Sequence, residues 1–225
     1  RLQSVSSFTL DGITVRNTTT SGGSNPNRTV YVDGSTGTFA NSRIVASAGN
    51  YPIGLDVVSG SDVSASSSVF TSLTLESGYD TAEIDSSSYA VQVGLGTSDT
   101  SSLEITSSEI RAARPAGTTN PTTAGIRSVS SSQLTVSDSV IYGGDPGDDA
   151  TGDTSAILML ANTQNASITG NTIIMDSNDR TRGIWTYTTG TLLVDRNYIE
   201  VQNAAVTNEM IRVQDAGGPG VTIRN

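Results

Sequence analysis

Residues 165–174 read Asn-Ala-Ser-Ile-Thr-Gly-Asn-Thr-Ile-Ile. Ile168 and Ile173 stand five positions apart in this stretch, and the polar Asn171 lies two places before the second isoleucine. A unit that repeats with a period of roughly 20 to 50 residues predicts a repeat architecture. The same spacing of two apolar residues recurs along the whole chain, at Leu10/Val15, Phe39/Ile44, Ala65/Phe70, Ile105/Ile110, Val136/Ile141, Ile168/Ile173 and Val194/Ile199, and it begins again at Val221.

A second pattern precedes each copy of the first. It is a small residue followed by an apolar-x-apolar triplet, and its first apolar residues lie 25 to 36 positions apart, at Val30, Leu55, Val91, Ile126, Ile157, Ile184 and Ile211. Short alternating segments of this kind are typical of β-strands that need neighbours above and below to pair with. Stacking the units as successive turns gives every strand parallel partners. The sequence therefore predicts an all-β parallel β-helix solenoid of about seven coils.

The repeats run from end to end without a break in composition, which predicts one domain over residues 1–225. Four stretches rich in Gly, Pro, Asp, Ser and Thr lengthen individual units, at residues 79–88, 95–102, 113–123 and 143–154. We expect these to be loop insertions at coil corners. Because the last copy is cut at Val221, we expect the domain to be part of a longer chain or of a fibre of stacked subunits.

Composition restricts the chemistry that the chain can perform. It has no Cys, His or Lys; its twelve basic residues are all Arg, and its formal net charge is −10. Thiolate metal sites and a histidine base are therefore excluded, and the acidic charge argues against a nucleic acid as partner. No apolar run reaches the roughly 20 residues that a membrane-spanning helix needs, so we expect no membrane span.

Residues 165–174, 133–141 (Gln-Leu-Thr-Val-Ser-Asp-Ser-Val-Ile) and 8–17 (Phe-Thr-Leu-Asp-Gly-Ile-Thr-Val-Arg-Asn) resemble coils of the right-handed parallel β-helix proteins of the pectin-lyase-like superfamily. The resemblance covers nearly the whole chain and implies a right-handed coil. The same scaffold carries lyases, hydrolases, tailspikes and adhesins, so the resemblance implies a fold and not one activity. The polygalacturonase-type catalytic set needs His and Lys, which this chain lacks.

If the isoleucines of the second pattern point inward, the residues next to them point outward. Stacked in successive coils, these outward residues bring the only tryptophan together with a tyrosine and two arginines. This combination suits a sugar ring or a protein partner. The alternative is that an insertion such as 143–154 covers this patch and makes it a second small core. The predicted ligand or interface patch consists of Arg127, Val129, Leu158, Leu160, Trp185, Tyr187 and Arg212.

One insertion is a candidate calcium site. Asp145, Asp148, Asp149 and Asp153 lie among glycines, and carboxylates on such a loop are suitable Ca²⁺ ligands. The alternative is a solvated acidic turn, and the spacing matches no EF-hand. We expect no other cofactor.

The polar position of the first pattern has a structural interpretation. It is Ser or Asn in six copies and Ile13 in the first. Identical positions stack in a β-helix, so Asn171, Asn197 and the serines predict an internal ladder of hydrogen bonds at one coil corner.

These observations predict an extracellular or cell-surface β-helix with a structural or adhesive, non-catalytic role. Its expected partner is a glycan, a protein surface or a further copy stacked end to end. The alternative is a segment of a polysaccharide-degrading or glycan-binding β-helix protein of the lyase, hydrolase or tailspike type. The residues do not decide whether the protein is an enzyme, although no catalytic set is visible.

Overall fold

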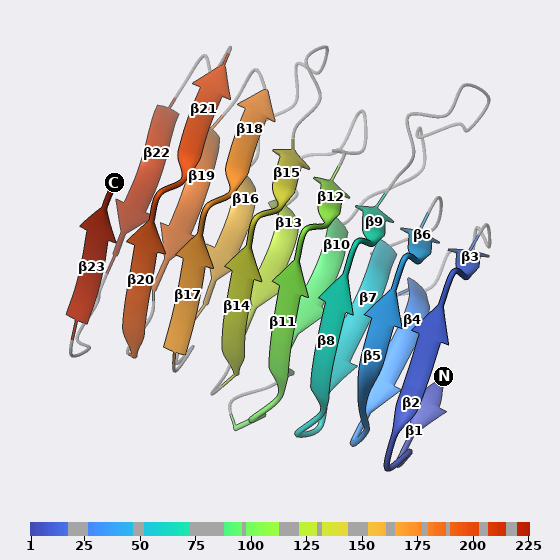
Figure 1. The fold of residues 1–225 in the computed structure, drawn as a ribbon. Coiled ribbons are helices and arrows are strands. Elements are labelled where there is room, and N and C mark those ends of the chain that lie inside the picture. The colour runs from blue at the N-terminus through green and yellow to red at the C-terminus, as the bar shows by residue number, and fades with distance from the viewer. Residues whose placement is uncertain are drawn as a thin grey trace.

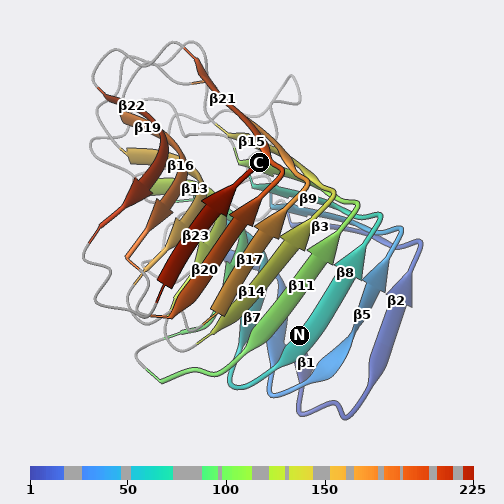
Figure 2. The same cartoon turned by 60° about the vertical axis from the view of Figure 1, so that its left-hand side comes forward.

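The structure, a computed structural model, describes residues 1–17, 27–46, 52–72, 88–95, 98–112, 122–129, 132–143, 153–160, 165–176, 180–187, 190–202, 207–214 and 220–225. These residues form three parallel β-sheets, which we name A, B and C, and they contain no helix. Successive turns of the chain stack along one axis (Figures 1 and 2). The predicted all-β parallel β-helix is therefore confirmed.

Each sheet takes every third strand of the chain. Sheet A contains β1 (Leu2–Gln3), β4 (Asn27–Asp33), β7 (Pro52–Val58), β10 (Ser88–Val93), β13 (Thr122–Ser128), β16 (Asp153–Met159), β19 (Arg180–Thr186) and β22 (Thr207–Val213). Sheet B contains β2 (Phe8–Asp11), β5 (Thr36–Ala40), β8 (Asp62–Ser66), β11 (Ser102–Thr106), β14 (Gln133–Ser137), β17 (Asn165–Thr169), β20 (Thr191–Asp195) and β23 (Gly220–Arg224). Sheet C contains β3 (Thr14–Asn17), β6 (Arg43–Ala46), β9 (Val69–Ser72), β12 (Glu109–Ala112), β15 (Val140–Gly143), β18 (Thr172–Asp176) and β21 (Tyr198–Gln202).

The chain passes through sheets A, B and C in turn and then begins the next coil. In Figure 1 the strands of sheet B run upward at the front and those of sheet A run downward behind them, while the chain advances from right to left. This path is a right-handed coil. Because each strand pairs with its equivalents one coil before and one coil after, like positions form columns along the axis.

The inward columns form the hydrophobic core. Ile126 pairs in register with Ile157, Ile157 with Ile184, and Ile184 with Ile211, as the repeat predicts. The first three side chains are completely buried, and Ile211 packs against the same core. Adjacent strands lie about 4.8 Å apart, so these isoleucines make one continuous stack.

The corner between sheets B and C carries the predicted polar ladder. The backbone N–H of each ladder residue donates to the side-chain oxygen of the next, over 2.9–3.1 Å, in the order Ser42, Ser68, Ser108, Ser139, Asn171 and Asn197. Ile13, the one apolar residue at this position, is tolerated because it takes part in the ladder only through its backbone N–H, which donates to Ser42 Oγ. The residue before each ladder position turns the corner with a positive φ of 47–67°: Gly12, Asn41, Ser67, Ser107, Asp138, Gly170 and Arg196.

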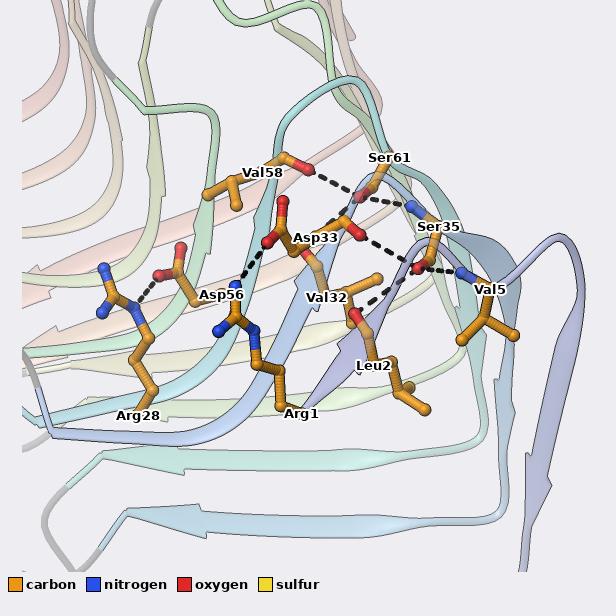
Figure 3. Close-up of polar contacts among 10 residues, drawn as sticks. All are labelled: Arg1, Leu2, Val5, Arg28, Val32, Asp33, Ser35, Asp56, Val58 and Ser61. Carbon is orange, nitrogen blue, oxygen red and sulfur yellow. Dashed lines mark hydrogen bonds and ion pairs between the residues drawn. The ribbon is translucent and has the colours of Figure 1, made fainter.

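A second ladder, which the repeat analysis missed, lies at the corner between sheets A and B. Figure 3 shows its first rungs, in which Val5 N–H donates to Ser35 Oγ at 2.9 Å and Ser35 N–H donates to Ser61 Oγ at 3.1 Å. Ser61 N–H continues the ladder to Ser101 Oγ at 3.2 Å. The two ladders satisfy buried backbone donors at successive corners and so fix the coil in register.

The small residue of the second pattern marks a bend in the strands of sheet A. A Cβ built on Gly54 would lie 2.5 Å from the carbonyl oxygen of Ala90, and one on Gly183 would lie 2.5 Å from that of Met210. The ladder register skips this position, since Ile53 and Leu55 pair with Tyr89 and Val91 while Gly54 is passed over. The bend lets the residue directly before the small position and the residue two places after it both face outward, as Arg182 and Trp185 do on either side of Gly183.

The predicted insertions are described only in part. Their ends at 88, 102, 122–123, 143 and 153–154 belong to strands, and 98–101 form part of the corner between sheets A and B. Leu95 is described as well, and the remainder of the insertions lies outside the described residues. Among the residues that are described, none forms a helix long and apolar enough to cross a membrane.

Candidate functional site on the outward face of sheet A

The outward rows of sheet A have the predicted register. Arg127 pairs with Leu158, Leu158 with Trp185, and Trp185 with Arg212. Tyr187 N–H donates to Met159 O, which places Tyr187 beside Leu160 on the neighbouring coil. The structure therefore brings the residues of the predicted patch together on adjacent coils.

The middle of this face is a second apolar cluster. Leu158 is only 1% exposed and belongs to one apolar cluster with Ile53, Tyr89 and Ala124. Leu160 and Trp185 are half-buried and pack against this cluster. Of the two interpretations left open by the sequence, burial favours a small second core at Leu158. The indole of Trp185 forms the partly exposed margin of this cluster. Val129 is also nearly buried.

A hydrogen-bonded row crosses the N-terminal half of the face. The Asp56 carboxylate, which is completely buried, forms an ion pair with Arg28 Nε (Figure 3). Gln92 Nε2 donates to Asp56 Oδ1 at 3.0 Å, and Arg127 Nη1 donates to Gln92 Oε1 at 2.6 Å. Burial raises the pKa of Asp56, although the hydrogen bonds and charge of Arg28 partly oppose it.

A charged group surrounds Trp185 in the C-terminal half. Arg182, only 3% exposed, donates to Asp153 Oδ1 at 2.7 Å and to Glu209 Oε2 at 2.8 Å. Its guanidinium carbon lies 4.0 Å from the centroid of the Trp185 ring, and that of Arg212 lies 5.6 Å away. The Tyr187 ring is tilted against Trp185, with centroids 5.2 Å apart. These contacts hold the indole by cation–π and aromatic packing.

The charges of this group stabilise one another. Burial lowers the pKa of Arg182, but the hydrogen bonds that it donates to Asp153 and Glu209 outweigh this effect and the pKa is raised. Burial raises the pKa of Glu209, but its bonds to Arg182 and Arg212 outweigh that effect and the pKa is lowered. Both groups are therefore held in their charged forms.

Sequence reasoning missed Arg182 and Glu209. Strict alternation places residue 182 on the same side as the inward Ile184, two positions later. The bend at Gly183 reverses this, so that Arg182 faces outward three residues before Trp185. The signal that could have found Arg182 is the small residue Gly183, whereas the equivalent position after Glu209 is Met210 and gives no such signal.

Among the residues that the structure describes, three buried polar atoms on this face have no hydrogen-bond partner: Arg127 Nε, Ser155 Oγ and Trp185 Nε1. Ser155 pairs in register with Arg182, and Leu158 on the same strand lies between Arg127 and Trp185. Arg Nε and Trp Nε1 can only donate. Buried polar groups are almost always paired, so these three atoms are exceptions on this face.

The candidate calcium ligands are described only at Asp153. Its carboxylate is engaged by Arg182 at 2.7 Å, so a cationic side chain already occupies this acceptor. Asp145, Asp148 and Asp149 lie outside the described residues. Within the described ranges, no group of three acidic side chains gathers closely enough to hold a metal ion.

Comparisons of this chain with family models, with curated proteins and with solved structures find no match.

Proposed function

We propose that this chain is an extracellular or cell-surface adhesive β-helix module on a pectin-lyase-like scaffold, without catalytic activity of its own. We further propose that it binds a glycan at the C-terminal part of the outward face of sheet A. We name this place the Trp185 site and define it by Arg127, Leu160, Trp185, Tyr187 and Arg212. The observation that carries the proposal is the half-buried indole on the outward face, with the Tyr187 ring packed beside it and the Arg212 guanidinium next to it.

The chemistry of the Trp185 site suits a sugar better than an apolar ligand. Arg127 and Arg212 are half-buried, and a hydroxyl-rich ligand supplies oxygen acceptors for guanidinium N–H groups. Trp185 and Tyr187 offer ring surfaces on which a sugar ring can pack. Arg182 is paired with two carboxylates and almost completely buried, whereas Arg212 is half-buried at the margin, where N–H groups not used by Glu209 and Gln214 can contact a ligand.

The alternative is a segment of a polysaccharide-degrading β-helix. The specific observation that favours it is Asp56, which lies beside Arg28 and whose pKa is raised by burial. A raised pKa is what a carboxyl group needs to act as a general acid. Its side chain is completely buried, however, and a catalytic acid has to reach the substrate. We therefore rank this role second, and an assay for released reducing ends and unsaturated uronates tests it.

Self-association end to end is a further partner proposal. Among the described residues, four of the five exposed large apolar side chains lie on the last strands: Tyr198, Met210, Val213 and Ile223. Unpaired strand edges with apolar side chains favour strand addition. Light scattering across a concentration series distinguishes a monomer from a growing stack.

A glycan array probed with three variants tests the Trp185 site. We expect Trp185→Ala to weaken glycan binding by at least about tenfold while the chain still folds, since the side chain lies at the margin of its cluster. Trp185→Phe keeps an aromatic ring of smaller area, so its loss of glycan binding should be intermediate. Tyr198→Ala removes an aromatic that is 58% exposed elsewhere and serves as the control. Unchanged binding by folded Trp185→Ala would contradict the proposal.

A further inference from the structure

The outward face of sheet B offers a second surface, distinct from the Trp185 site. All of its strands are described, and their side chains alternate between the core and solvent. The middle outward column carries a hydroxyl in six of eight coils: Thr9, Thr38, Ser64, Thr135, Ser167 and Thr222. Short hydroxyl side chains on a paired sheet lose little freedom when they bind a ligand.

Two shallow hollows follow this column. One, of about 380 Å³, lies over β2, β5, β8 and the start of β11, and its lining includes Thr38 and Ser64. The other, of about 450 Å³, lies over β14, β17, β20 and β23, and its lining includes Thr135 and Ser167. Each hollow crosses successive strands, so the two lie end to end along the coil axis. We name them together the sheet B groove.

The charges of the groove select against one class of ligand. Asp62 and Glu104 line the N-terminal hollow, and neither hollow has an arginine among its described lining residues. Acidic polymers would therefore meet like charge without a compensating cation. An uncharged polymer meets no such penalty.

The remaining groups are hydrogen-bonding and neutral. Thr191 Oγ1 donates to Asn165 Oδ1 at 2.6 Å, which orients the amide in the C-terminal hollow and leaves its two N–H donors directed elsewhere. Hydroxyls of Thr135 and Ser167 can donate and accept. This mixture of donors and acceptors is complementary to sugar hydroxyls.

We propose that the sheet B groove binds a linear polysaccharide that carries no acidic groups, laid along the coil axis across the strands. The column offers a hydroxyl in six of its eight coils, so a polymer makes several weak contacts of the same kind and gains affinity from their number. The proposal does not depend on Trp185, which lies on another sheet.

Native affinity electrophoresis of the full chain tests it, with hydroxyethylcellulose, pullulan and laminarin as uncharged probes and polygalacturonate as the acidic one. The groove variant is Thr135→Arg with Ser167→Arg, which fills the hollow from two adjacent strands. The matched control is Ser137→Arg with Thr169→Arg, two residues further along the same strands and on the same face but outside the groove lining. Both variants add the same charge.

We expect at least one uncharged probe to retard the native chain. The affinity for this probe should fall by about tenfold or more in the groove variant and should be unchanged in the control. Trp185→Ala should leave the retardation unchanged, which separates this proposal from that of the Trp185 site. The proposal is overturned if no uncharged probe retards the native chain, if polygalacturonate retards it equally, if both double variants behave alike, or if Trp185→Ala abolishes the effect.

Discussion

Arg28 and Asp56 form an ion pair between adjacent strands of sheet A, and the Asp56 carboxylate of this pair is completely buried. The pair lies on the outward face of the coil and not in its core. Burial raises the pKa of Asp56 above its usual 3.8. The folded chain thus holds the Asp56 proton more tightly than the unfolded chain, so this group contributes most to stability below about pH 3.8. That contribution is lost as the pH rises through the folded-state pKa.

Removal of Arg28 should destabilise the fold, because it leaves the buried Asp56 carboxylate without its ion-pair partner. We expect Arg28→Ala to lower the free energy of unfolding by about 3 kcal/mol at neutral pH, because an uncompensated charge remains buried. The loss should shrink on acidification as Asp56 takes up a proton. Denaturant titrations at several pH values measure it. Arg1→Ala, which breaks the exposed pair with Asp33, is the control and should cost less than about 1 kcal/mol. Equal losses in the two variants would show that Asp56 is solvated.

Asp99 should show the opposite dependence on pH. Its carboxylate accepts backbone N–H bonds from Ser59, Gly60 and Leu95 at 2.8–3.2 Å, and also bonds to Ser101. Burial raises the pKa of Asp99, but these hydrogen bonds outweigh it and the pKa is lowered. Its contribution to stability is therefore present above about pH 3.8 and is lost as the pH falls through the lower folded-state pKa.

Accordingly, Asp99→Asn should lower the free energy of unfolding by about 2 kcal/mol at neutral pH, because an amide cannot accept hydrogen bonds from all of these donors. The difference in stability between this variant and the native chain should become smaller as the pH falls below about 3.8. Thermal melts across this range follow it. Glu104→Gln, an exposed change on sheet B, should leave the melts unchanged. A native-like melt of Asp99→Asn at neutral pH would contradict the account.

The ladder between sheets B and C predicts a rescue. Asn171 Oδ1 accepts from Ser139 N–H at 3.0 Å, and Asn171 Nδ2 donates to Val136 O at 3.0 Å. Asn171→Ala should cost about 3 kcal/mol, since buried backbone groups lose their partners. Asn171→Ser should recover most of this, because serine fills the same position in four other coils. If serine is no better than alanine in chemical denaturation, the ladder is not what stabilises this corner.

Neighbouring residues on β17 should respond differently to the same substitution, because they face opposite sides of sheet B. Ile168 is completely buried in the core column, whereas Ser167 faces outward. Ile168→Asp should cost more than about 4 kcal/mol and abolish the cooperative melt, because it buries an unpaired charge. Ser167→Asp should change stability by less than about 0.5 kcal/mol. Circular dichroism melts compare the two, and similar melts would show that the register is wrong.

The sequence predicts those features of this fold that repeat. The inward isoleucine stack, the outward row through Trp185 and the ladder at Asn171 each follow from a spacing that recurs in every coil. The serine ladder through Ser35 and Ser61 was missed because serine is abundant throughout the chain, so its spacing does not stand out.

Two features of the site could not be predicted from periodicity. The bend at Gly183 turns Arg182 outward against strict alternation, and local spacing does not reveal it. The burial of Asp56 and Leu158 on an outward face depends on contacts between segments distant in sequence. Alternation predicts which face a side chain takes, but it does not predict whether that face is covered.

The central claim is that a glycan binds at Trp185, and the emission of this residue tests it most directly because it is the only tryptophan in the chain. The glycan retained most strongly on the array is titrated into the native protein while emission and acrylamide quenching are followed. We predict a saturable blue shift and a loss of quenching, with a midpoint equal to the affinity measured independently, because the ligand excludes water from the half-buried indole. Binding that saturates without any change in the emission or quenching of Trp185 would contradict the account.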